Sequence, residues 1–198
     1  MLQSDLSMYI SKQFQNYGLL QDDDVDVMAY YLENIISLSL VVLSIIGIAI
    51  LTGLHKESAL YFLTFFAGRY CCGGYHAKTH LRCYLLTMGT YLLFLLLSIG
   101  FIKAGEPNIA VSFIIAAANI LIVLFAPADS ENKRFTKKEK DFYRKKSLFL
   151  LVICDLLYIG TLTNLFTDYL FPFFFAVFQL AVSVAIVKML ERKNYVKD

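Results

Sequence analysis

One stretch of the chain, residues 69–83, gathers side chains that could carry out a reaction. It reads RYCCGGYHAKTHLRC and lies between two apolar segments. Cys83 could serve as a nucleophile and His76 as its general base, with the cations Arg69 and Lys78 nearby in the sequence. A cysteine activated by a neighbouring base is a common arrangement for covalent attack on a carbonyl group. Because no other stretch of the sequence combines a nucleophile, a base and cations, 69–83 is the candidate active-site segment.

The spacing of this pair predicts a break in the helix. Cys83 follows His76 by seven residues, which on a straight helix would separate their Cα atoms by roughly 10 Å. Proton transfer needs about 2.6–3.2 Å between the two groups, or one bridging water. The glycines at 73–74 would each cost a helix interior about 1 kcal/mol and favour a turn. Thr79 is a suitable N-cap for a helix that begins directly after it. Cys83 would lie in the first turns of that helix, where the positive helix end favours a thiolate.

Two other interpretations of the segment stay open. The first is a zinc site in a zinc-dependent membrane hydrolase. Its ligands would be two thiols and two imidazoles at near-helical spacing, namely Cys72, His76, His80 and Cys83. The second is a structural role, in which Cys71, Cys72 and His80 are ordinary small or interfacial residues. A non-enzymatic transporter or scaffold, with the segment as its gate, is a further alternative for the whole protein.

The composition of the chain indicates a membrane protein. Of its 198 residues, 58% are hydrophobic and 17% are charged. In a typical soluble domain about 45–50% of the residues are apolar and about 25% are charged. The net charge of +2 does not indicate a nucleic-acid partner. About 20 apolar residues cross a hydrocarbon core about 30 Å thick, and five segments approach that length. These are 35–54, 84–102, 109–126, 147–163 and 169–187, of which only the fourth contains a charge.

A sixth apolar segment, 58–68, is too short to be assigned from composition alone. It either begins a helix that continues into polar residues or forms a re-entrant segment. We favour the first alternative. It predicts an all-α polytopic membrane helix bundle of about six spans, forming a single integral-membrane domain over 1–198.

The first 24 residues form a predicted amphipathic segment. Apolar side chains recur there at helical spacing, with polar residues between them: Leu6, Ile10, Phe14 and Tyr17. Such a helix would lie in the membrane interface. A soluble cap on the bundle fits the pattern equally well.

Basic residues in the loops set the predicted orientation. The segment 127–146 carries eight lysines and arginines, so the positive-inside rule makes it a cytoplasmic loop. The basic C-terminal tail returns to the same side after two spans. Counting back from the loop places 69–83 on the cytoplasmic face.

Three polar side chains lie within or beside the apolar spans. Asp155 is costly in a hydrocarbon environment and is therefore a functional or helix-pairing candidate. Asn164 and Gln179 are predicted to form hydrogen bonds between helices.

Two separated motifs resemble one known family. The first is the order Arg69…Gly74-Tyr-His76-Ala-Lys78…Cys83. The second is Phe125-Ala-Pro127-Ala-Asp129-Ser-Glu-Asn132-Lys133, which closes a span and opens the basic loop. Together they resemble the accessory gene regulator B family, the membrane endopeptidases of quorum sensing in Gram-positive bacteria. The likeness extends over nearly the whole chain.

The resemblance implies a reaction and a location for it. Cys83 would be the nucleophile and His76 its general base, with Arg69, Gly74 and Lys78 in supporting positions. The substrate would be a short precursor peptide whose C-terminal tail is removed and whose remainder closes into a thiolactone or lactone ring. No metal or other cofactor is expected. The enzyme would be a multi-pass protein of the bacterial cell membrane.

The predicted partners follow from the same resemblance and from charge. Precursors of the family typically carry acidic C-terminal tails, which basic side chains would attract. The candidates are Lys133, Lys137, Lys138 and Lys140, although the loop that holds them also serves as a topology signal. The predicted partners are the precursor peptide, membrane lipid and a second copy of the chain in a homodimer. Nucleic acid is not among them.

Overall fold

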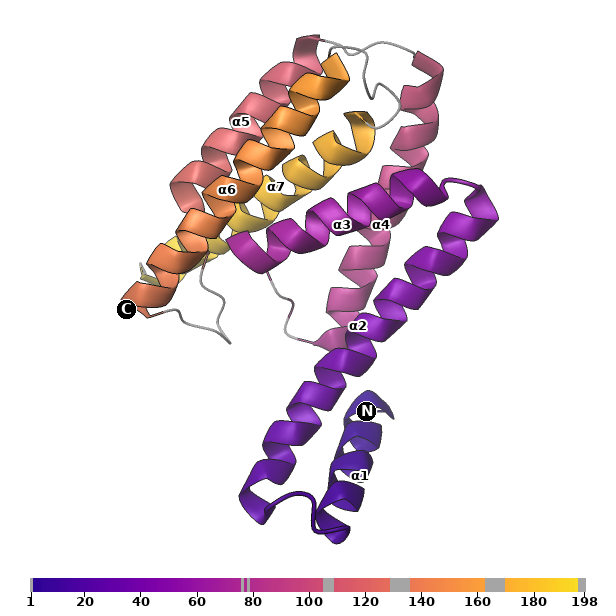
Figure 1. Ribbon diagram of the computed structural model, residues 1–198, viewed down its shortest axis with the longest axis vertical. Coiled ribbons are helices and arrows are strands. Elements are labelled where there is room, and N and C mark those ends of the chain that lie inside the picture. The colour runs from indigo at the N-terminus through magenta and orange to yellow at the C-terminus, as the bar shows by residue number, and fades with distance from the viewer. Residues whose placement is uncertain are drawn as a thin grey trace. The chain divides into compact units, whose positions relative to one another are not determined.

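The computed structural model is helical and has no strand among the residues it describes, which are 2–75, 77, 79–104, 109–128, 136–162 and 170–195. In chain order the helices are α1 (Leu2–Asn16), the 3-10 turn η1 (Asp22–Asp24), α2 (Val25–Thr52), α3 (His55–Cys72), α4 (His80–Ala104), α5 (Ile109–Phe125), α6 (Lys137–Leu162) and α7 (Leu170–Tyr195) (Figure 1). The all-α prediction is thus confirmed.

The chain divides into two compact units. The first comprises Met1–Gly53 and Lys78–Tyr91, and the second Leu54–Ala77 and Leu92–Asp198.

In the first unit α1 packs along α2 (Figure 1). α1 ends because Gly18 adopts a left-handed conformation with φ of 70°, which glycine reaches without the steric cost of a side chain. Leu19 N then donates to Phe14 O at 3.0 Å. α2 begins after the exposed acidic turn 22–24, whose carboxylates complement the positive end of the helix.

A helix, α1, covers most of the N-terminal segment, and its amphipathic character stays a prediction. Ser7 and Ser11 are buried, and small side chains of this kind let two helices approach closely. The apolar side chains of Leu6 and Phe14 in α1 are exposed instead, as is Tyr17 just beyond its end. α1 therefore turns apolar side chains outward, as a helix in contact with lipid would. Its place in the membrane interface stays a prediction.

Three described helices are long and apolar enough to cross a membrane, namely Asp22–Thr52, His80–Gly100 and Phe171–Leu190, and Ser112–Phe125 is a shorter apolar helix. Their exposed side chains include many leucines, isoleucines and phenylalanines. The segment 58–68 lies within α3, a continuous helix that runs on into polar residues. This is the first of the two alternatives for that segment. The number of six spans and their orientation stay predictions.

In the second unit α3, α5 and α6 pack against α7 (Figure 1). The core consists of small and branched side chains from these helices and from segment 126–128: Cys72, Ala118, Ile122, Ala126, Ala128, Leu151, Cys154, Val177, Leu180, Ala181, Val184 and Val187. Gly68 of α3 allows the close approach of α7, because a Cβ there would lie 2.7 Å from Leu180 Cδ2. The packing brings the end of α3 against the middle of α7.

Two polar links join helices of the second unit. Tyr61 of α3 donates a hydrogen bond to Gln179 of α7, so the predicted interhelical role of Gln179 is confirmed. Asn119 Nδ2 of α5 donates to Asp155 Oδ1 of α6 at 2.6 Å. This bond favours the helix-pairing alternative for Asp155. Asn164 lies outside the described residues.

Candidate active site

The predicted interruption of the helix is present between α3 and α4. α3 ends at Cys72, and the next two residues, Gly73 and Gly74, have φ angles of 70° and 132°. Residues with a side chain rarely adopt such positive φ angles, so the glycine pair ends the helix. α4 then begins at His80. A continuous helix, which would have held the predicted nucleophile and base apart, is thereby excluded.

α4 begins as the sequence predicts. Thr79 Oγ1 accepts a hydrogen bond from Arg82 N at 3.3 Å, and Thr79 O accepts one from Cys83 N at 3.0 Å. Thr79 is therefore the N-cap. Cys83 lies half-buried in the first turn of α4, where unpaired backbone N–H groups create a positive potential. The Cys83 carbonyl oxygen accepts from Thr87 Oγ1 at 2.9 Å.

In the first unit α2 contacts the start of α4 at two points. His80 Nε2 lies 3.4 Å from Glu33 Oε1, and the hydroxyl oxygens of Ser44 and Tyr84 are 2.9 Å apart. This contact engages only one of the two imidazole nitrogens of His80. His80 therefore links α4 to α2, and its role as a zinc ligand stays an untested alternative.

The turn that follows α3 is fastened to α7. Arg69 donates through Nη1 to Ser183 Oγ and through Nη2 to the carbonyl oxygen of Tyr75. Tyr75 N donates to the same Ser183 Oγ at 3.0 Å. The next residue, His76, and also Lys78, lie outside the described residues. Sequence reasoning misses Ser183, because a single serine in an apolar helix gives no local signal of its partners.

The two glycines of the turn are crowded by their neighbours. A Cβ on Gly74 would lie 2.6 Å from Ser183 Oγ and closer still to the Arg69 guanidinium group. A Cβ on Gly73 would lie 2.5 Å from the carbonyl oxygen of Ala128. Real Cβ atoms essentially never come within 3.0 Å of such atoms. A side chain on Gly73 would therefore displace the turn from Ala128, and one on Gly74 would push aside the Arg69 and Ser183 side chains that hold the turn.

The second sequence motif meets the first at this turn. Ala128 N donates to Cys72 O at 2.9 Å, and Gly73 and Ala128 form an isolated parallel β-bridge. Ala126 and Ala128 are buried in the core of the second unit. Segment 126–128 therefore supports the end of α3, which gives a physical reason for the joint occurrence of two motifs so far apart in the sequence.

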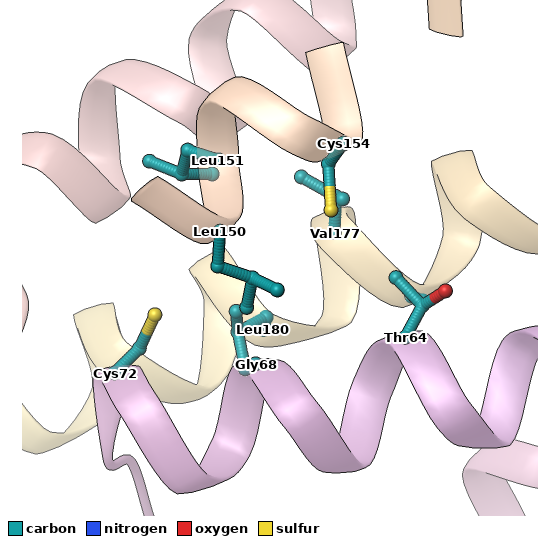
Figure 2. Close-up of a pocket in the computed structure, with 9 residues that line it drawn as sticks. Thr64, Gly68, Cys72, Leu150, Leu151, Cys154, Val177 and Leu180 are labelled. Carbon is teal, nitrogen blue, oxygen red and sulfur yellow. The ribbon is translucent and has the colours of Figure 1, made fainter. Parts of the chain in front are cut away.

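A small cavity lies between α3, α6 and α7 (Figure 2). Its lining includes the thiols of Cys72 and Cys154 and the apolar side chains of Leu150, Val177 and Leu180. Its volume of about 10 Å³ has room for one water at most. The cavity is therefore a packing defect and not a peptide-binding site.

The thiols near the end of α3 differ from Cys83 in their surroundings. Burial, together with the neighbouring thiols of Cys71 and Cys154, raises the pKa of Cys72 to about 12. Burial also raises the pKa of Cys71, against the opposing effect of Lys146. Both thiols are therefore held in the protonated form, which is the weaker nucleophile. This agrees with the structural alternative for Cys71 and Cys72.

The basic segment 127–146 is partly helical, where the sequence predicts a loop. Thr136 N donates to Glu139 Oε2 at 2.9 Å, and Glu139 N donates to Thr136 Oγ1 at 3.3 Å. This reciprocal capping box starts α6 at Lys137. The residues T-x-x-E at 136–139 are a local signal that could have placed this helix start.

Three of the four lysines predicted to attract an acidic tail lie in the first turn of α6. Lys137 and Lys138 are exposed, and Lys140 is half-buried. The fourth, Lys133, lies outside the described residues.

Lys146 joins α6 to the end of α3. Its Nζ lies 4.4 Å from the ring centre of Phe142, 5.6 Å from that of Tyr70 and 5.9 Å from that of Tyr143. Tyr70 and Tyr143 meet edge to face, with ring centres 6.0 Å apart. A cation over aromatic rings contributes about 0.5–1 kcal/mol at an exposed site. These contacts hold the basic part of α6 beside the last turn of α3.

Among the described residues, no three side chains of histidine, cysteine, aspartate or glutamate lie close enough together to hold a metal ion. The zinc alternative also requires His76, which is not one of those residues. It stays an untested prediction.

One known family matches almost the whole chain. The sequence profile of the family described as accessory gene regulator B matches residues 5–190. No match was found among curated proteins or among solved structures. The matched range contains both sequence motifs. It therefore also contains Cys83 and the turn after α3 that is bonded to α7. The family is involved in the processing of quorum-sensing peptides, and the apolar helices agree with association with a membrane. The chain belongs to the accessory gene regulator B family.

Proposed function

We propose that the protein is a membrane cysteine endopeptidase that removes the C-terminal tail of a quorum-sensing precursor peptide, with Cys83 as the nucleophile and His76 as the general base. The interrupted helix carries this proposal. α3 ends at Cys72, and α4 starts anew with Cys83 in its first turn. Because α3 ends before His76 in the sequence and α4 begins after it, one straight helix does not set the distance between the two side chains. Family membership supports the peptide-processing class.

In the first step His76 takes the proton of the Cys83 thiol, and the thiolate attacks the scissile carbonyl carbon. A C–S bond forms and the C–N bond of the peptide breaks. The proton on His76 passes to the departing amine, which becomes the N-terminus of the released tail. The acyl group stays on Cys83 as a thioester. The N-terminal end of α4 stabilises the thiolate through its positive potential.

In the second step a cysteine or serine side chain within the precursor attacks the thioester carbonyl carbon. The new C–S or C–O bond closes a thiolactone or lactone ring, and the bond to Cys83 breaks. The proton of the attacking group passes through His76 to the Cys83 sulfur, which restores the enzyme. Exclusion of water from the acyl-enzyme favours ring closure over hydrolysis.

We place the protein in the bacterial cell membrane with about six spans, formed by α2 to α7. The active-site segment faces the cytoplasm in this arrangement, because the basic start of α6 faces it. The exposed apolar side chains of the long helices support a membrane setting.

The lysines at the start of α6 provide a site for an acidic tail. Replacing Lys137, Lys138 and Lys140 together by glutamate should raise KM on the order of tenfold at low salt, because attraction at a distance becomes repulsion. The kcat for bound precursor should change little. A precursor whose tail carries neutral amides serves as the control and should be insensitive to the triple substitution. An equal loss with the neutral tail would contradict tail binding.

The deciding experiment uses the full-length protein in liposomes with the candidate precursor. Wild type is compared with Cys83→Ser, His76→Ala and His80→Ala, each with and without chelator. We expect a thioester-linked intermediate in the wild type that Cys83→Ser lacks. His76→Ala should slow cleavage by about 10²–10⁴-fold, whereas His80→Ala should remain close to wild type. Loss of cleavage on chelation would point to a zinc hydrolase, and no cleavage under any condition would point to a transporter or scaffold.

A further inference from the structure

We propose that Ser183, on α7, is a positioning residue that fixes the turn at Tyr75, the residue that precedes the proposed general base in the sequence. The inference rests on the proposed function, since it assigns to Ser183 the support of the turn that follows α3. It also assigns a specific task to Arg69, which shares the Ser183 hydroxyl with the turn.

Both backbone polar groups of Tyr75 are held by these two side chains. Tyr75 N donates to Ser183 Oγ at 3.0 Å, and the Tyr75 carbonyl oxygen accepts from Arg69 Nη2. Tyr75 is therefore held through both of its backbone polar groups, one bonded to α7 and the other to α3.

The chemistry of the two side chains suits this task. The Ser183 hydroxyl has two lone pairs, and it uses them to accept from Arg69 Nη1 and from Tyr75 N. The planar guanidinium group of Arg69 donates in two directions at once, which the single ammonium group of a lysine does less well. The absence of a Cβ at Gly74 leaves room for both groups.

Ser183 is well placed to impose a geometry on the turn. It lies between Ala181 and Val184, which are 1% and 0% exposed in the core of the second unit. Leu180, on the same helix, packs onto Gly68 of α3. A site held by packed helices is more exact than one held by a loop alone. The turn thus takes its position from α7.

The test compares Ser183→Ala with Ser183→Thr in the liposome assay. Ser183→Ala removes the acceptor of two N–H groups, so we expect kcat to fall 10- to 100-fold while KM changes less than threefold. Ser183→Thr keeps the hydroxyl and should restore kcat to within about threefold of wild type. Ser98→Ala is the matched control, because that hydroxyl donates to Phe94 O in its own helix.

Hydrogen exchange provides a readout that does not depend on activity. In Ser183→Ala the amide of Tyr75 should exchange at least tenfold faster, while the amides of α7 keep their protection. Faster exchange throughout α3, α5 and α7, or an unchanged kcat, would overturn the positioning role.

A double-mutant cycle tests whether Arg69 and Ser183 act through the same hydrogen-bonded link. We compare the single variants Arg69→Gln and Ser183→Ala with the double variant that carries both changes. The fold-decrease in kcat of the double variant should be much smaller than the product of the two single fold-decreases, because each substitution disrupts the same link. Independent effects would overturn the shared role. Cleavage that persists in Cys83→Ser would instead overturn the proposed function, whatever Ser183→Ala does to the amide of Tyr75.

Discussion

Gly74 is constrained in two independent ways. Its φ of 132° lies outside the range that side chains favour, and the space a Cβ would need is taken by Ser183 and Arg69. The sequence predicts the first constraint, because a glycine pair inside an otherwise helical pattern marks a turn. The second constraint depends on a helix more than a hundred residues away and is visible only in the fold.

Gly74→Ala should therefore destabilise the protein by about 1–3 kcal/mol, the cost of one residue held in a strained backbone conformation. It should also reduce cleavage, because the new methyl group must push the Arg69 and Ser183 side chains out of the positions in which they hold the turn. The free energy of unfolding in a denaturing detergent and the rate of tail release would measure the two effects. Gly89→Ala is the matched control, since a Cβ there meets nothing within 4 Å and alanine is the better helix former by about 0.5–1 kcal/mol. Equal stability and activity of the two variants would refute the steric argument.

The buried thiols offer a test based on pH. A thiol with a pKa of about 12, as burial gives Cys72, is ionised to only about one part in 10⁴ at pH 8. Because a raised pKa favours the neutral form, alkylation of Cys72 should be slow at pH 8 and rise with pH up to 10 without a plateau. The half-buried Cys83 should be alkylated first, as mass spectrometry of the peptides would show. Modification of Cys72 as early as Cys83 would contradict this assignment.

Among the helices, α6 differs most from its sequence-based description. The segment 127–146 reads as a topology signal, yet its second half is a helix with a capping box at Thr136 and Glu139. Lys146 in that helix contacts Tyr70 of α3, so one of the eight cations has a packing role as well as a charge.

Lys146→Met should loosen the contact between α6 and α3 by about 0.5–2 kcal/mol, since three aromatic rings lose their cation. Lys146→Arg should retain most of the stability, because a guanidinium group also stacks on rings. The unfolding free energy in detergent would measure both. Lys145→Met removes the same charge from an exposed neighbouring position and should have little effect. A similar loss in both methionine variants would show that net charge, and not the ring contact, is responsible.

The features that the sequence predicts at this scale are local. The glycine break, the Thr79 cap and the first-turn position of Cys83 depend on residues within one or two helical turns of each other. The apolar segments likewise mark α2, α4, α5 and α7, because period and length are local properties. The links to Ala128 and Ser183 are not predicted, since they are set by how α3 packs on α7 and on segment 126–128.

At the scale of the whole molecule, the orientation in the membrane is the main prediction left to test. Limited trypsin digestion of sealed vesicles would test it, because the segment 127–146 contains eight cleavable positions. We expect cleavage there in inverted vesicles and protection in right-side-out vesicles, as the positive-inside rule requires. Lys103, near the end of α4, would lie on the outer side in the predicted orientation, so cleavage after it should show the opposite pattern. Cleavage of 127–146 from the outside would place the active-site segment on the wrong face for a cytoplasmic precursor.

The anchors of the turn are made later than the turn itself. Arg69 and Tyr75 bond to a serine that follows them by 114 and 108 residues, and Gly73 is supported by Ala128. A chain emerging from the ribosome therefore carries residues 69–83 long before the serine that anchors the turn. The turn can acquire these anchors only after α7 has been synthesised. A chain truncated before α7 should therefore lack the proposed peptidase activity.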